Sequence, residues 1–201
     1  MYERFTHRAI IAMTLADQEA QRVDHIYVAT GHLLLGILKE GGGVGAHVLK
    51  NFGLNLNMAR RYFREIFQDG PEVVSMGPLP RSPDYNRAIE EAIEFTRRWG
   101  HKYVGTEHLT AGVTRMPDSI AVKILNRAKI NPERVVEDIE RLLGIIESTV
   151  NVNEEGYDGR KSSKADVLTI SFDLGRIGMI LTGEQVHIDS LNRGPSYFNL
   201  G

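Results

Sequence analysis

The pattern of apolar and polar positions predicts a mainly α-helical protein. Over residues 4–23, the side chains of Ala9, Met13, Ala16 and Ala20 recur at the three- and four-residue spacing of one helix face. The same periodicity predicts further helices over residues 30–38, 44–51, 57–68, 83–99, 106–115, 118–128 and 132–147. Glycine and proline clusters lie between several of these segments, as expected of turns and loops.

The periodicity changes towards the C-terminus. Residues 148–164 lose the helical period and are rich in Asn, Glu, Gly, Ser and Lys, which predicts a linker. Alternation of apolar and polar residues then predicts a small antiparallel β extension over residues 165–201, with strands at 167–172, 177–181 and 186–191. Because so small a sheet leaves an apolar face and two edges exposed, we expect it to dock on the helical body or to form a homodimer.

One segment of the chain occurs twice. The sequence Tyr-Val-Ala-Thr-Gly-His-Leu at residues 27–33 returns as Tyr-Val-Gly-Thr-Glu-His-Leu at residues 103–109. The same spacing aligns the two halves without a gap, placing Thr6 on Ser82, for example. A period this long indicates duplication of a four-helix unit. We therefore predict one domain over residues 1–147, built from two pseudo-symmetric four-helix repeats at about 1–69 and 77–147.

The repeated segment contains a predicted helix start. Thr30 and Thr106 are placed to cap the helices that follow them, and Thr6 is placed to cap the first helix. Glu107 lies in the first turn of its helix, where the helix dipole favours a carboxylate. The equivalent residue in the first repeat is Gly31, so we expect the two repeats to share a fold and to differ in surface.

Composition excludes several classes of protein. The 42% apolar and 25% charged residues are typical of a globular protein, and a net charge of −2 gives no electrostatic case for binding nucleic acid. The absence of cysteine excludes disulfides, thiolate metal sites and cysteine nucleophiles. No apolar run approaches the roughly 20 residues that span a bilayer, and no signal-peptide core follows the N-terminus, so the expected location is cytoplasmic.

The chemically reactive residue types give no catalytic pattern. His25, His32, His101 and His108 form pairs seven residues apart, for which a structural role at the loop–helix junction is favoured over a metal site. The glycine run at 41–43 lacks the lysine and hydroxyl residue of a phosphate-binding loop and is interpreted as a turn. The basic residues Arg60, Arg61 and Arg64 are either a solvated helix face or a patch for an acidic partner, and the solvated face is favoured. We predict a non-enzyme without a cofactor or metal.

Three stretches carry a resemblance to a known family. The repeated Tyr-Val-x-Thr-x-His-Leu segment, the opening residues 2–6 and the connecting residues 70–77 resemble the N-terminal domain of the Clp/Hsp100 unfoldases, most like the ClpC type, over about residues 1–146. This resemblance implies an all-α double repeat that docks adaptor proteins and substrates onto a hexameric unfoldase. The chain departs from the family in having no Walker A motif, and residues 150–201 match nothing in it.

The resemblance implies two functions. The first is a non-enzymatic protein-binding module for Clp-type proteolysis, whose partners are adaptors, substrate proteins or unfoldase subunits, with no nucleic acid and no membrane. The alternative is sensing of phosphoarginine or a related anion, because ClpC-type domains can receive a guanidinium on the glutamate of the Thr-Glu-His element and the phosphate on nearby donors. Carried over by position, this site centres on the second repeat. Its candidate residues are Thr106, Glu107, Thr30, Thr6 and Arg8.

Overall fold

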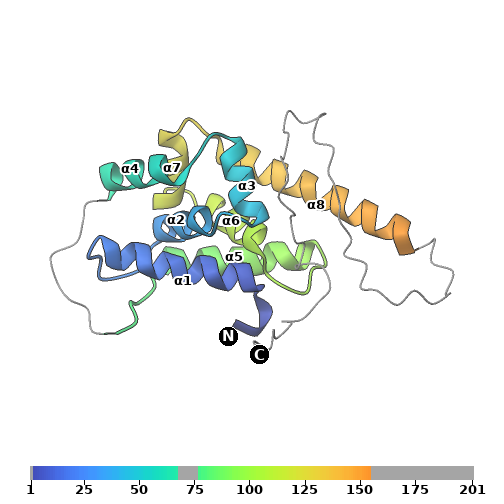
Figure 1. Cartoon of the computed structure of the whole chain (residues 1–201), viewed down its shortest axis with the longest axis horizontal. Coiled ribbons are helices and arrows are strands. Elements are labelled where there is room, and N and C mark those ends of the chain that lie inside the picture. Colours follow the sequence, from blue (N-terminus) through green and yellow to red (C-terminus); the bar gives the residue numbers. More distant parts are fainter. Residues whose placement is uncertain (1, 68–76, 155–201) are drawn as a thin grey trace, which may run out of the picture.

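The computed structural model describes residues 2–67 and 77–154, and these ranges form a helical body without a β-strand (Figure 1). After a short 3-10 turn, η1 (Tyr2–Arg4), the first repeat contains α1 (His7–Arg22), α2 (Thr30–Glu40), α3 (Val44–Asn51) and α4 (Leu56–Ile66). The second contains α5 (Pro83–Arg98), α6 (Thr106–Thr114), α7 (Ile120–Arg127) and α8 (Pro132–Glu154). The prediction of a mainly α fold is confirmed. None of the described helices is long and apolar enough to cross a membrane.

The two repeats have the same order and spacing of helices. α2 and α6 begin at the two threonines of the duplicated segment, Thr30 and Thr106, and α3 and α7 begin at Val44 and Ile120, the same distance further along. The first helix of each repeat also has an equivalent N-cap. Thr6 caps α1, and Ser82 caps α5. The predicted duplication of a four-helix unit is therefore visible in the backbone.

Some predicted boundaries were wrong. α8 continues to Glu154, so residues 148–154, which we assigned to the linker, are helical. α4 ends at Ile66 rather than at residue 68. The predicted β extension at 165–201 lies outside the described residues, so its strands, its docking and the homodimer stay predictions.

α2 and α6 lie at the centre of the body, and the other helices surround them (Figure 1). All residues of α6 and residues 30–38 of α2 are buried. α2 packs mainly on α1, and α6 packs mainly on α5. A helix that is buried on every side needs neighbours all round it, and each central helix contacts helices of both repeats, so the repeats form one body.

Glycine lets each central helix approach its neighbour closely. A Cβ atom on Gly36 of α2 would lie 2.2 Å from the carbonyl oxygen of Ala12 in α1. A Cβ atom on Gly112 of α6 would lie 2.2 Å from the carbonyl oxygen of Ala88 in α5. Because these oxygens belong to helix backbone, a side chain here would force the two helices apart.

The segment before each repeat forms backbone hydrogen bonds with the other repeat. Phe5, before α1, forms a parallel bridge with Val104, before α6. Val28, before α2, forms the equivalent bridge with Arg81, before α5. In each bridge the central valine both donates and accepts a backbone hydrogen bond, at 2.7 to 3.0 Å. The segment that leads into each repeat is therefore held by the other repeat.

Replacing Gly36 with alanine should destabilise the protein by roughly 2 kcal/mol, because overpacking against backbone outweighs the higher helix propensity of alanine. Gly144→Ala is the matched control, since a Cβ there meets Trp99 at an ordinary 3.9 Å. That control should be neutral or stabilising by up to about 1 kcal/mol. Urea unfolding followed by circular dichroism measures both. Equal stabilities of the two variants would contradict the close approach.

Candidate functional site

The first turns of α2 and α6 are capped by histidine. The residues before these helices, Ala29 and Gly105, have no side chain that can cap. Instead, Nδ1 of His32 accepts the backbone N–H of Ala29, and Nδ1 of His108 accepts that of Gly105, both at 2.9 Å. The prediction that the threonines of this segment cap their own helices was wrong, because they are the first residues inside the helix.

The two threonine hydroxyls instead bind the opposite repeat. Thr106 Oγ1 accepts the backbone N–H of Gly45, in the first turn of α3, at 3.3 Å. Thr30 Oγ1 accepts the N–H of Ala121, in the first turn of α7, at 3.4 Å. Each threonine therefore satisfies a free N–H at a helix start that lies in the other repeat. Both side chains are buried, which makes this role structural.

The histidines form two ring pairs. Nδ1 of His25 lies 2.9 Å from Nε2 of His32, and Nδ1 of His101 lies 2.8 Å from Nε2 of His108. Since Nδ1 of His32 is an acceptor, its neutral ring carries the proton on Nε2 and donates it to His25. The predicted role of these residues at the junction is confirmed. No group of three or more potential metal ligands occurs in the described part of the chain.

The environment of His32 keeps its ring neutral. Burial lowers the pKa of His32 to about 3, with His25 and Arg22 adding to the fall and Glu19 opposing it. Because the ring has 0% exposure, protonation would place a charge in the core beside a capping contact.

Four of the five candidate residues lie around the start of α6. Thr6 caps α1, and its backbone N–H donates to Val104, just before α6. Arg8 pairs with Glu40 and packs on Gly42. The adjoining Gly43 packs on Thr106. Thr30 lies elsewhere, at the start of α2.

Glu107 is buried with an unsatisfied oxygen. Its side chain packs on Gly105, the residue is 3% exposed, and Oε1 has no hydrogen-bond donor. Oε1 lies 3.1 Å from Nδ1 of His108, but that nitrogen already accepts the Gly105 N–H and has no proton to give while the ring is neutral. Burial raises the pKa of Glu107. The charge of His108, a hydrogen bond from its ring when that ring is protonated, a hydrogen bond from the Glu107 backbone and the charge of His101 lower it, with a net downward shift.

Gly31, the equivalent of Glu107 in the first repeat, has no room for a side chain. A Cβ on Gly31 would lie 2.5 Å from Cγ2 of Ile120 and 2.7 Å from the ring of Phe63. Glycine is therefore required by packing, and a glutamate does not fit. These two apolar side chains explain why the repeats differ at this position, which is buried in both repeats rather than on the surface as expected.

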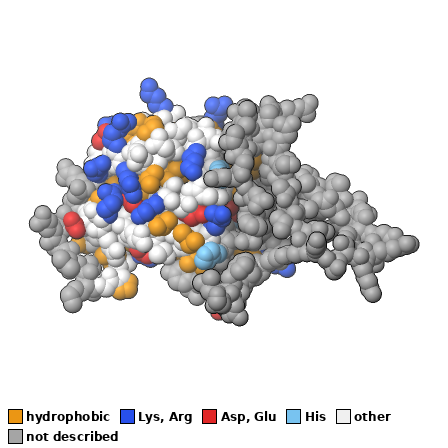
Figure 2. All heavy atoms as spheres, in the orientation of Figure 1, with side chains coloured by type: hydrophobic (Ala, Val, Ile, Leu, Met, Phe, Trp, Pro, Cys, Tyr) orange, Lys and Arg blue, Asp and Glu red, His pale blue; other side chains and the backbone are white. Residues whose placement is uncertain are grey.

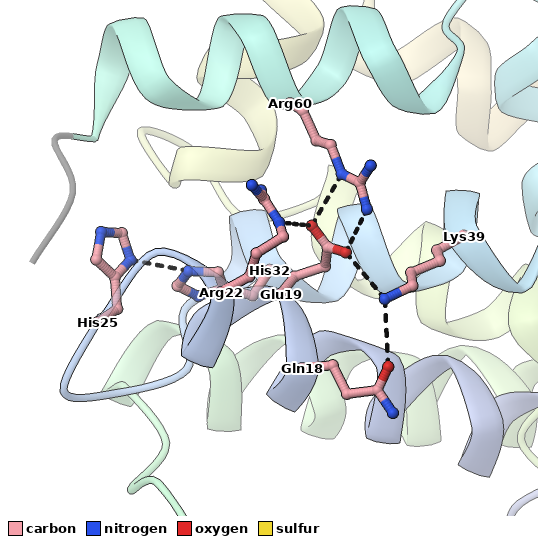
Figure 3. Close-up of polar contacts among 7 residues, drawn as sticks. All are labelled: Gln18, Glu19, Arg22, His25, His32, Lys39 and Arg60. Carbon is pink, nitrogen blue, oxygen red and sulfur yellow. Dashed lines mark hydrogen bonds and ion pairs between the residues drawn. The ribbon is translucent and has the colours of Figure 1, made fainter. Parts of the chain in front are cut away.

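A buried charge cluster of the first repeat was missed by sequence reasoning. The carboxylate of Glu19 in α1 has 0% side-chain exposure and binds Arg22, Lys39 and Arg60 from three helices (Figure 3). Arg60 donates from both Nε and Nη2, at 3.0 and 2.6 Å. Burial raises the pKa of Glu19, but the hydrogen bonds from Arg60, Lys39 and Arg22 outweigh it and hold the pKa at about 2.

Among the described residues, the equivalent junction of the second repeat has no buried carboxylate of this kind. Phe95 occupies the position equivalent to Glu19, and Val136 that of Arg60. The guanidinium groups of Arg98 and Arg115, equivalent to Arg22 and Lys39, lie 5.5 and 5.0 Å from the centre of the Phe95 ring. The same helix junction is thus built with cation–π contacts in place of a buried carboxylate, and Arg115 in addition pairs with Glu140 of α8. A charge within the apolar stripe of α1 is the signal that marked Glu19 in the sequence.

Acid should destabilise the protein in two stages. The pKa of His32 falls from 6.5 to about 3 in the folded protein, so the unfolded chain binds the proton more readily, and stability is lost as the pH falls from about 6.5 towards 3. Glu19, at about 2 against 4.5, adds a loss only below about pH 4.5. Each group contributes at most about 1.4 kcal/mol per pH unit.

The variant His32→Gln isolates the first stage, because glutamine can still accept the backbone N–H at this helix position. Between pH 6.5 and 4.5 its stability, measured by urea unfolding, should fall less steeply than that of the wild type. The exposed His7 supplies the control, and His7→Gln should follow the wild-type slope. A wild-type slope in His32→Gln would contradict a neutral His32.

Comparison with known sequences places these features in a family. The chain matches the Clp repeat (R) N-terminal domain at residues 4–116 and again at residues 82–165. A ClpA homolog of Guillardia theta, named as an ATP-dependent Clp protease ATP-binding subunit, is 39% identical over 144 residues, which are 72% of this chain and 18% of that protein. The chloroplastic chaperone protein ClpC1 of Oryza sativa is 36% identical over 168 residues, 84% of this chain and 18% of that protein. The chain thus spans about a fifth of the length of these relatives.

Solved structures agree with this assignment. The N-terminal domain of the ClpD chaperone from Arabidopsis thaliana superposes with a TM-score of 0.62 at 26% identity, covering 72% of this chain and 97% of that one. The Hsp104 N-terminal domain from Candida albicans shares the fold, with a TM-score of 0.60 at 14% identity over 71% of this chain and 93% of that one. The duplicated helical unit, its sequence and its fold lead to one conclusion: the chain belongs to the family of the Clp repeat N-terminal domain.

Proposed function

We propose that the chain is a non-enzymatic protein-binding module that docks adaptors or substrates in Clp-type ATP-dependent proteolysis. The observation that carries the proposal is the match of both repeats to the N-terminal domain of Clp ATP-binding subunits. This role requires a rigid body with distinctive surfaces and no bond-making chemistry.

The division of the side chains between interior and surface supports the proposal. The threonines and histidines of the duplicated segment cap helices and pair with one another inside the body. They hold together a scaffold whose interior is nearly alike in the two repeats. The outer residues differ: the exposed Arg61 of the first repeat, for example, corresponds to the exposed Glu137 of the second. Such a scaffold can present a different surface from each repeat to a protein partner.

Competition in a reconstituted degradation reaction tests docking. The full chain, added in excess to a ClpC-type unfoldase, its peptidase, an adaptor and an adaptor-dependent substrate, should slow degradation as it occupies the adaptor or substrate. ATP hydrolysis in its presence should continue, and the chain alone should hydrolyse none. Gly144→Ala should compete like the wild type. If the chain neither slows degradation nor binds any component by light scattering, docking is excluded.

A second candidate function is recognition of phosphoarginine at the start of α6. The buried Oε1 of Glu107, without a donor, favours it, because a guanidinium supplies the N–H groups that a carboxylate lacks. Arg8, which pairs with Glu40, the backbone of Thr6 and the hydroxyl of Thr106 lie around the same helix start, where an anion is favoured. Since Glu107 is 3% exposed, binding requires the residues packed around it to move and expose the carboxylate.

Calorimetric titration with phosphoarginine tests this candidate. Wild type should bind, and Glu107→Gln should lose roughly tenfold or more in affinity, the usual value of hydrogen bonds to a charged group. Glu133→Gln, also in the first turn of a helix, is the control and should bind as the wild type does. No heat with the wild type, or equal affinity in both variants, would remove phosphoarginine recognition and leave docking untouched.

A further inference from the structure

The face formed by α1, α2 and α4 carries an excess of positive charge. Lys and Arg side chains gather over these helices, with few acidic side chains among them (Figure 2). We name this surface the basic face, and its residues are Arg22, Lys39, Arg60, Arg61 and Arg64. The chain as a whole has a net charge of −2, so this concentration does not follow from composition.

The acidic residues of the same three helices do not neutralise the basic face. Asp17 pairs with Arg81 of the second repeat, Glu40 with Arg8, and Glu65 with Arg127 of α7. Only Glu19 remains for the basic face, and one carboxylate balances one of the five cations. Arg61 and Arg64 are exposed on α4, beside Arg60 at helical spacing.

Glu19 fixes part of this charge in place. It holds Arg22, Lys39 and Arg60 from below, while their side chains keep 38%, 30% and 25% exposure. Long cationic side chains usually lose much conformational freedom when they bind a partner. Here the buried carboxylate has already ordered three of them, and each keeps N–H donors beyond those that Glu19 accepts (Figure 3). An ordered set of donors at the surface lowers the cost of binding.

The shared fold does not require the cluster. The second repeat builds the same junction with Phe95 and Val136, and its two arginines lie against the aromatic ring. A buried ion-pair cluster is generally no more stable than a well-packed apolar alternative. The charged residues of the first repeat are therefore better explained by binding at their exposed ends than by a contribution to stability.

We propose that the basic face docks an acidic polypeptide segment of a partner protein. This inference rests on the docking function and names the chemistry of its partner. Carboxylates suit the array because guanidinium groups bind them in paired hydrogen bonds. A protein is favoured over a nucleic acid because the chain has a net charge of −2, which gives it no long-range attraction for a phosphate backbone.

Fluorescence anisotropy with a labelled oligoglutamate peptide tests the proposal on the full chain. Wild type should bind at low salt, and the affinity should fall as salt screens the charges. The double variant Arg61→Gln/Arg64→Gln removes two exposed cations without touching Glu19, and should weaken binding about tenfold. Arg134→Gln/Arg141→Gln on α8 makes the same change in net charge in the second repeat, and should stay within about twofold of wild type.

The outcomes separate this inference from the docking function. Failure of oligoglutamate to bind wild type, equal loss in both double variants, or tighter binding of a single-stranded oligonucleotide of equal charge each overturns the acidic-partner proposal. If Arg61→Gln/Arg64→Gln still slows degradation in the competition reaction, docking stands and uses another surface. Melting curves of both double variants confirm that the fold is intact before either comparison is made.

Discussion

The exchange of hydrogen bonds between the repeats is the constraint on which the rest of the structure depends. The strand-like bridges of Phe5 with Val104 and of Val28 with Arg81 join the entrance of each repeat to the other. The hydroxyls of Thr30 and Thr106 each accept a hydrogen bond from the third helix of the opposite repeat. With both ends tied in this way, α2 and α6 are enclosed on all sides, and their buried histidines and glycines have fixed neighbours. Neither repeat is complete in isolation.

Within this symmetric frame the two repeats have diverged in chemistry at matched places. Where the first repeat buries a carboxylate under three cations, the second buries a phenyl ring under two arginines. Where the second repeat has Glu107, the first has glycine beneath two apolar side chains. At both positions the two repeats keep the same helices although the side chains differ. Duplication thus supplies one scaffold with two independent sets of polar groups, and only their chemistry has to change for a new partner.

The helices and the repeats could be predicted from the sequence because their signals are local. The start of α3 at Val44 and of α2 at Thr30 follow from glycines, apolar periodicity and the duplicated segment. The role of the threonines could not be predicted, because their partners, Gly45 and Ala121, are 61 and 91 residues away. Local capping rules describe only nearby N–H groups. The charge cluster was missed for the same reason, since Glu19 meets Arg60 only after three helices have packed.

The bridge between Val28 and Arg81 has a consequence for how the chain folds during synthesis. The first repeat lacks its bridging segment until residue 81 has emerged, and Thr30 lacks its partner until Ala121 has. Domains usually fold from the N-terminus as they are made, and distant contacts form slowly. We therefore expect the part of α2 that packs on α5, α6 and α7 to stay uncovered until most of the second repeat has left the ribosome. The two repeats of this protein are thus expected to fold together in a single late event rather than one after the other.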